Sequence, residues 1–195
     1  MSEIAQLGEP RAYSLIRQML AALGLDIDTD PELLDTPRRW YSLLEDFCHG
    51  YTEADLLAII KEGFVAPKQG GMVVQSDIPF RGMCAHHLAP YFGVAHIGYI
   101  PNRRVVGLSK MARLVDAAGT SRPWNQESTT NLIADTLHSA IDAQGTIVVT
   151  RAQHSCMFVR GPRAVGTTTS VSALRGLFLT VPAARSEFFE LVKAH

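Results

Sequence analysis

The sequence has few cysteines, no excess of either charge and no long apolar run. Its 195 residues carry a formal net charge of −1, which gives no overall attraction to nucleic acid or to an anionic membrane. No apolar run approaches the roughly 20 residues of a membrane-spanning helix, and the first residues lack the basic start of a secretory signal. The cysteines are too few for a disulfide framework, since they are only Cys48, Cys84 and Cys156. We therefore expect a cytoplasmic protein with no nucleic-acid or membrane partner.

Hydrophobic residues make up 47% of the chain, which is enough for a sizeable core. Apolar side chains at helical spacing predict helices over 10–25, 36–49, 53–63, 109–118 and 127–143. Short runs rich in Val, Ile, Phe and Tyr predict strands over 72–80, 91–100, 104–108, 146–152, 156–161 and 174–181. Residues 65–71 read as a linker. The sum is an α+β chain: a helical segment over 1–66, then an antiparallel sheet carrying two helices on one face over 67–195.

Two short clusters of cysteine and histidine stand out. The stretch MCAHHLAPYFG holds Cys84, His86 and His87, and QHSCM holds His154 and Cys156. On a strand, residues two apart lie on one face, so the second cluster presents both its side chains to one site. Two thiolates and one imidazole would leave a fourth tetrahedral position for water, as in catalytic zinc sites. Two histidines would remain for proton transfer.

The alternative for each of these five residues is structural. Cysteines are often buried as small apolar side chains, and a histidine can satisfy its ring nitrogens on backbone carbonyls. For a single residue this alternative is the commoner one. For five residues in two short clusters the metal site is favoured.

Several polar residues could bind a phosphorylated substrate. GLSKMAR places basic side chains at a predicted helix start, which suits phosphate oxygens. A carboxylate beside an amide in RPWNQES could accept hydrogen bonds from a guanine edge. The alternatives are ordinary solvated charge and an acid favoured by the helix dipole. The candidates are Ser109, Lys110, Arg113, Gln126, Glu127, Arg160 and Arg39.

Taken together and in order, these motifs resemble the zinc-dependent GTP cyclohydrolase I family. The resemblance runs from about residue 34 to residue 178. Its pieces are LLDTPRRW, CAHHLAPYFGVAHIGYIP, GLSKMARLVD, the QE pair, QHSCMFVRGPR and SALRGLF. The second piece is similar to the family's C-E-H-H-L-x-P-F-x-G-x-x-H-I-x-Y-I-P stretch.

The resemblance implies a role for each candidate. Cys84, His87 and Cys156 would hold one Zn²⁺ per subunit, with His86 and His154 transferring protons. Gln126 and Glu127 would hold the guanine. Ser109, Lys110, Arg113 and Arg160 would face the ribose and triphosphate, and Arg39 would reach the triphosphate from a neighbouring subunit.

The implied fold is the tunnelling fold, assembled as a toroidal homodecamer with active sites between subunits. The implied reaction hydrolyses GTP at guanine C8, where zinc lowers the pKa of the attacking water to roughly 7. Formate is released, and the ribose opens, rearranges and recloses to give 7,8-dihydroneopterin triphosphate.

The chain departs from the family pattern at four places. Ala85 replaces the glutamate of C-E-H-H, Ser42 stands where a lysine is usual, and Ser128 stands where an arginine is usual. The segment AAGTS, residues 117–121, is one residue longer. Three of these changes affect charge near the substrate, so we expect GTP as substrate with weaker triphosphate binding.

Three other interpretations remain open. A divergent paralogue could stop at the ring-opened formamide or serve a specialised deazapurine or pterin pathway. A nitrile reductase of the same fold would need a cysteine–aspartate pair, and the cysteine and histidine clusters disfavour it. A non-catalytic module with structural zinc or bound nucleotide would usually use four protein ligands.

Overall fold

The computed structural model describes residues 9–61, 63–66 and 71–193. The chain divides into two compact units, Met1–Gly50 and Tyr51–His195. The helices of the first unit are α2 (Glu9–Ala22) and α3 (Thr36–Glu45). The elements of the second unit are α4 (Glu53–Ile60), β1 (Gly63–Val65), β2 (Val73–Cys84), β3 (Ala89–Ile100), β4 (Arg104–Val106), α5 (Leu108–Thr120), α6 (Gln126–Ala140), β5 (Gly145–His154), α7 (Ser155–Phe158), β6 (Thr169–Gly176), α8 (Leu177–Thr180) and α9 (Pro182–Lys193).

In the first unit, α2 and α3 share a small core. Ile16 and Leu20 are buried together with Ile27, and Trp40 and Tyr41 of α3 pack against them. Not every apolar side chain of α2 is buried, since Leu15 is 54% exposed. The helix α3 begins at Thr36 as predicted, but the residue at its N-cap is Asp35.

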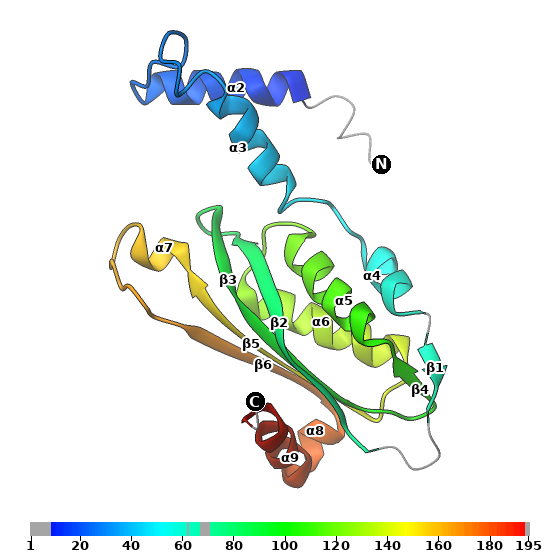
Figure 1. The fold of residues 1–195 in the computed structure, drawn as a ribbon. Helices are drawn as coiled ribbons and strands as arrows, with labels where there is room; N and C mark the ends of the chain where they lie inside the picture. Colours follow the sequence, from blue (N-terminus) through cyan, green and yellow to red (C-terminus); the bar gives the residue numbers. More distant parts are fainter. Residues whose placement is uncertain (1–8, 62, 67–70, 194–195) are drawn as a thin grey trace. The chain divides into compact units, whose positions relative to one another are not determined.

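The second unit is built on a four-stranded antiparallel sheet in the order β2-β3-β5-β6. Side chains alternate between its two faces along β5: Val148 and Ala152 enter the main core, whereas Ile147 packs in a second cluster with Phe178 and Phe188. Helices α5 and α6 cover the first face, and α8 and α9 pack on one end of the second (Figure 1). This is the predicted α+β architecture, with two helices on one face of an antiparallel sheet.

Glycine allows α5 to lie directly on β2. A Cβ on Gly119 would stand 1.9 Å from the backbone oxygen of Arg81, so no other residue fits this crossing without movement. Arg81 also pairs with Asp116 of α5 at 2.9 Å. The C-terminal end of α5 is therefore fixed beside the C-terminal end of β2.

Helix α4 belongs with the sheet and not with the first two helices. Its side chains Leu56 and Ile60 are buried in the main core, against α5 and α6. The compact unit that holds the sheet accordingly starts at Tyr51, whereas we predicted the catalytic domain from residue 67. The functional division of the chain at residues 66 and 67 stays a prediction.

The predicted strand over residues 156–161 is wrong. The ladder between β3 and β5 ends where Tyr91 pairs with His154. Beyond that point the chain forms the short helix α7, in which the Val159 N–H donates to the Ser155 carbonyl at 2.9 Å. A short apolar run does not by itself separate strand from helix, and here the end of the ladder decides.

Three further differences concern one strand end, the predicted linker and the last helix. The run over residues 174–181 ends its strand at Gly176, which has a φ of 57° and leads into α8. The linker predicted over 65–71 overlaps β1, and its residues 67–70 lie outside the described residues. Helix α9 was not predicted. Within the described part of the chain, the helices are too short or too polar to cross a membrane.

Candidate metal and active site

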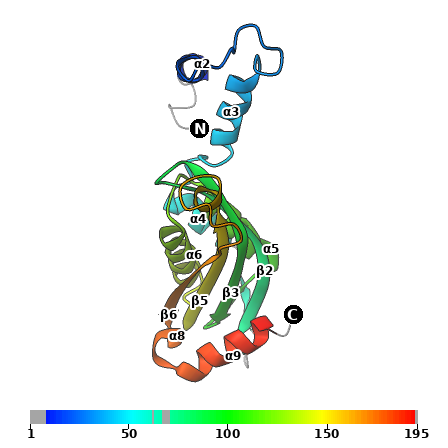
Figure 2. The same ribbon diagram turned by 90° about the vertical axis from the view of Figure 1, so that its left-hand side faces the viewer.

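The two cysteine and histidine clusters meet at one end of the sheet. Cys84 is the last residue of β2, and His154 is the last residue of β5. The antiparallel pairing through β3 brings these two strand ends together, next to α7 and the start of α6 (Figure 1). The helices α8 and α9 pack at the other end of the sheet (Figure 2).

Cys84, His154 and Cys156 form a group whose candidate ligand atoms all lie within 4.8 Å of one another. Cys84 is buried, whereas His154 and Cys156 are half-buried. The Ser155 hydroxyl donates to the Pro90 carbonyl at 2.6 Å, which fixes the turn between His154 and Cys156. The predicted pairing of His154 with Cys156 is thus confirmed as a juxtaposition, although a strand-to-helix turn creates it.

The donor chemistry of this group fits zinc. Two sulfurs and one imidazole are typical zinc ligands, and a tetrahedral site would separate them by about 3.3–3.8 Å. Burial and the neighbouring Cys84 raise the pKa of the Cys156 thiol, while the Arg160 guanidinium lowers it. A bound cation would reverse the net effect, because coordination deprotonates a thiol. The group therefore has the composition of a three-ligand zinc site, and its candidate ligand atoms, within 4.8 Å of one another, lie close enough to share one ion after a small adjustment.

His86 and His87 lie on the exposed turn between β2 and β3. The Nδ1 atom of His86 is 3.7 Å from the Cys84 sulfur. The Nε2 atom of His87 contacts a guanidinium nitrogen of Arg160. A guanidinium only donates hydrogen bonds, so His87 presents a lone pair to it. The structure thus places His86 and Arg160 at the site, and pairs His87 with Arg160.

His154 is held by two neighbours. Its Nε2 atom lies 2.9 Å from Oε1 of Gln126, and its ring stacks on Tyr91 with 4.8 Å between ring centroids. Burial lowers the pKa of His154, and the carboxylate of Glu127 opposes this shift. Burial also raises the pKa of Tyr91 to about 12, so this phenol stays neutral. Sequence reasoning missed Tyr91, and its only signal was its place in the β3 run that pairs with the second cluster.

Gln126 and Glu127 begin α6, as predicted, but their side chains lie in different surroundings. The Asn125 side chain caps the helix by accepting from the Ser128 N–H at 2.9 Å. Gln126 is 1% exposed and points into the protein, whereas Glu127 is exposed. The two adjacent residues therefore cannot present their side chains in the same way.

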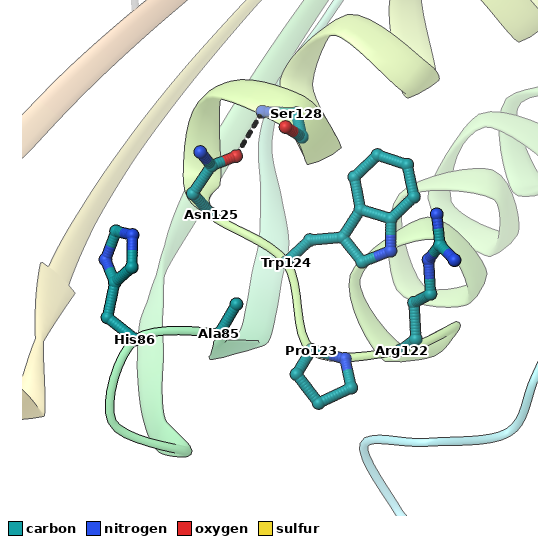
Figure 3. A pocket seen from close by; sticks show the side chains of 7 residues that line it. All are labelled: Ala85, His86, Arg122, Pro123, Trp124, Asn125 and Ser128. Atoms are coloured by element: carbon teal, nitrogen blue, oxygen red, sulfur yellow. Dashed lines mark hydrogen bonds between the residues drawn. The ribbon is translucent and has the colours of Figure 1, made fainter.

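A pocket of about 330 Å³ opens beside His86 (Figure 3). The loop before α6 lines it, and there the backbone N–H of Trp124 donates to the Met83 carbonyl at 2.9 Å. The Arg122 guanidinium lies 4.3 Å from the centroid of the Trp124 ring. Two of the departures from the family motifs line this one pocket. The lining residues are Ala85, His86, Arg122, Pro123, Trp124, Asn125 and Ser128.

Ser109, Lys110 and Arg113 lie at the opposite end of α5 from the cysteines. The start of α5 follows β4, where the Val106 N–H donates to the Tyr99 hydroxyl. Tyr99 pairs with Val73 at the beginning of β2, whereas Cys84 ends that strand. The helix between Ser109 and Thr120 is about 16 Å long. Within one chain these basic residues do not join the metal site.

Arg39 lies in the first unit, on α3. Its guanidinium pairs with the carboxylate of Asp35 at 3.2 Å, and both side chains are largely exposed. Its predicted role at the active site stays a prediction.

A family model described as GTP cyclohydrolase I matches residues 12–193 of the chain. The chain belongs to the GTP cyclohydrolase I family. GTP cyclohydrolase 1 of Corynebacterium glutamicum (strain R) is 42% identical over 194 residues, which cover 98% of this chain and 97% of the relative. GTP cyclohydrolase 1 of Mycobacterium tuberculosis (strain ATCC 25177 / H37Ra) is 40% identical over 193 residues, which cover 98% of this chain and 94% of that relative. The family predicted from the motifs is thus confirmed.

One similar solved structure is the apo form of the archaeosine synthase QueF-Like. Its sequence is 15% identical, and the TM-score is 0.45. The match covers 56% of the present chain and 97% of the archaeosine synthase chain. The group of Cys84, His154 and Cys156 is consistent with the zinc site expected from the motifs, but it contains His154 where the predicted ligand set had His87.

Proposed function

We propose that this chain hydrolyses GTP at guanine C8, releases formate and forms 7,8-dihydroneopterin triphosphate. The observation that carries this proposal is the group of Cys84, His154 and Cys156, which lies beside His86 at one end of the sheet in a chain of this family. When bound there, zinc would supply a water molecule activated for attack at neutral pH. The remaining steps need only acid–base groups.

We assign Cys84, Cys156 and His87 as the zinc ligands. The lone pair on Nε2 of His87 faces Arg160 in the structure, and Arg160 is itself a candidate for the substrate's phosphates. With zinc loaded, His87 would direct this lone pair to the metal, and Arg160 would then be left for the substrate's phosphates. His87 is exposed on a turn, so its ring has room to move.

His154 and His86 are then the proton-transferring residues. His154 lies close enough to both thiols to exchange a proton with a molecule bound between them. His86 lines the pocket beside the site, where it can reach a purine ring. Glu127 is exposed near His154, and its carboxylate can accept from N1–H and N2–H of a guanine.

The phosphate-binding residues of α5 favour an active site between subunits. Ser109, Lys110 and Arg113 lie at the far end of α5, so they can serve this reaction only from a neighbouring chain. The strands β2 and β6 are the two edges of the described four-stranded sheet. Pairing of β2 with β6 of the next subunit would close a ring and remove both edges, which supports the homodecamer expected from the motifs.

Mixed oligomers test this arrangement. Cys156→Ala removes the zinc half of each site, and the double variant Lys110→Ala/Arg113→Ala removes the phosphate half. After unfolding, mixing in equal amounts and reassembly, roughly a quarter of the sites would combine two intact halves if the halves come from different chains. We expect GTP turnover to rise well above that of either variant alone. No rise above the separate variants would place both halves in one chain.

Product analysis tests the reaction itself. The zinc-loaded protein is incubated with GTP, and we expect one formate per GTP together with a pterin that fluoresces after oxidation. A ring-opened formamide without formate would instead indicate the divergent paralogue. GMP is the matched control substrate: we expect a higher KM for GMP than for GTP, and an equal KM would remove the phosphate role from Lys110, Arg113 and Arg160.

A further inference from the structure

The Gln126 side chain is held by several hydrogen bonds from its amide nitrogen. Its Nε2 donates to the Thr150 hydroxyl at 2.9 Å, to the Thr150 carbonyl at 3.2 Å and to the Thr169 carbonyl at 3.1 Å. Carbonyl oxygens only accept hydrogen bonds. The NH₂ group must therefore face β5 and β6, and this assignment does not depend on choosing one of two equivalent amide orientations.

The threonines around Gln126 agree with this orientation. The Thr130 hydroxyl donates to the backbone carbonyl of Gln126 at 2.7 Å. The 2.8 Å contact between the Thr130 and Thr150 hydroxyls must then have Thr150 as its donor. The Thr150 oxygen is left to accept from Gln126. The three side chains form one directed network, and Oε1 of Gln126 is the end that faces His154.

This network determines which nitrogen of His154 carries hydrogen. An amide oxygen only accepts, so Nε2 of His154 must be the donor across their 2.9 Å contact. A neutral imidazole carries one hydrogen, so its Nδ1 keeps the lone pair. The stacked Tyr91 ring holds the plane of the imidazole, and the Tyr91 hydroxyl is itself held by Thr129 at 3.1 Å.

We propose that Gln126 is a positioning residue for His154, which holds the imidazole as the Nε2–H tautomer and leaves Nδ1 as its reacting nitrogen. This inference rests on the proposed function, in which His154 transfers a proton. It gives Gln126 a different task from its predicted one of holding guanine together with Glu127. Guanine contact is left to the exposed Glu127, while the buried amide acts only through the histidine.

The first test reads the tautomer directly. Zinc-loaded, full-length protein is labelled with ¹⁵N-histidine and studied by solid-state NMR, with His154→Ala used only to assign the signals. Protonated and unprotonated ring nitrogens have separate ¹⁵N shifts, and we expect His154 to carry hydrogen on Nε2. A hydrogen on Nδ1 would overturn the inference, whatever the protein does with GTP.

The second test separates positioning from substrate binding. Gln126→Met keeps the length of the side chain but removes its amide, and Glu127→Gln is the matched control at the adjacent position. We expect Gln126→Met to lower kcat by about 10- to 100-fold, with KM and the preference for GTP over ITP unchanged. ITP lacks the 2-amino group, so Glu127→Gln should raise KM for GTP and weaken that preference.

The outcomes are distinct. A raised KM and a lost preference for GTP in Gln126→Met, with kcat retained, would show that Gln126 reads guanine and overturn the inference. If Gln126→Met does not fold, the tautomer of the unaltered protein still decides. If the unaltered protein does not turn over GTP at all, the proposed function fails, and the NMR result stands separately from it.

Discussion

Cys156→Ala is expected to lose bound zinc and to lower kcat for GTP by about 10³-fold or more. Metal-ion catalysis supplies several kcal/mol of barrier reduction, and each 1.36 kcal/mol is about tenfold in rate. Cys156 lies on α7 in the group with Cys84 and His154, and its removal leaves one thiol for the metal. The measurements are metal content per chain by mass spectrometry and steady-state release of formate.

Cys48→Ala is the matched control for this prediction. Cys48 is also a free cysteine, but it is exposed and lies in the first compact unit. We expect it to retain one zinc per chain and its GTP turnover. If Cys156→Ala kept a full complement of zinc, Cys156 would not be a ligand, and the group at the end of the sheet would need another explanation.

The part of the metal site that could be predicted from the sequence is the part contained in short motifs. Cys84 and Cys156 were identified from two short motifs, and both reached the site even though the second motif was assigned the wrong secondary structure. The turn at α7 forms because the β3–β5 ladder stops at the pair of Tyr91 and His154. Strand pairing of this kind depends on residues far apart in the chain, and a single short run does not reveal it.

The contacts of Gln126 could not be predicted in the same way. Its amide meets His154 from 28 residues away and Thr169 from 43 residues away. The letters QE at a helix start suggest two equivalent polar side chains. Only the packing of α6 on β5 and β6 shows that one is buried and the other exposed.

The position of the α5 residues illustrates the same limit. GLSKMAR was correctly placed at a helix start, because α5 begins at Leu108. The direction of that helix along β2 is what separates Lys110 from Cys84, and it follows from contacts such as the ion pair between Arg81 and Asp116. A motif can thus be identified correctly from the sequence although the sequence does not show whether it serves the site of its own chain or that of a neighbouring chain.

The departures at Ala85 and Ser128 are linked by the structure. Both residues line the pocket beside His86. Relative to the family motifs, one change removes a negative charge and the other removes a positive charge, so their net effect on local charge cancels. The arginine that remains in the pocket lining is Arg122.

The roles of His87 and His154 give the second large expected effect. We expect His87→Ala to lose zinc, because it removes the third proposed ligand. His154→Ala should keep zinc and lower kcat by about 10²- to 10⁴-fold, which is the usual contribution of a positioned acid–base group. Zinc content and formate release are measured on the same preparations, so that a loss of metal and a loss of proton transfer are separated.

His138→Ala is the control, since His138 lies near the end of α6 and contacts Thr146, away from the cysteines. We expect it to change neither zinc content nor turnover. Loss of zinc in His154→Ala with full zinc in His87→Ala would exchange the two roles: His154 would be the third ligand, as the group within 4.8 Å already allows. Because Nε2 of His154 donates to Gln126, that ligand would have to bind through Nδ1. The tautomer fixed by Gln126 would then serve metal binding in place of proton transfer, and His87 would be left to carry the proton beside Arg160.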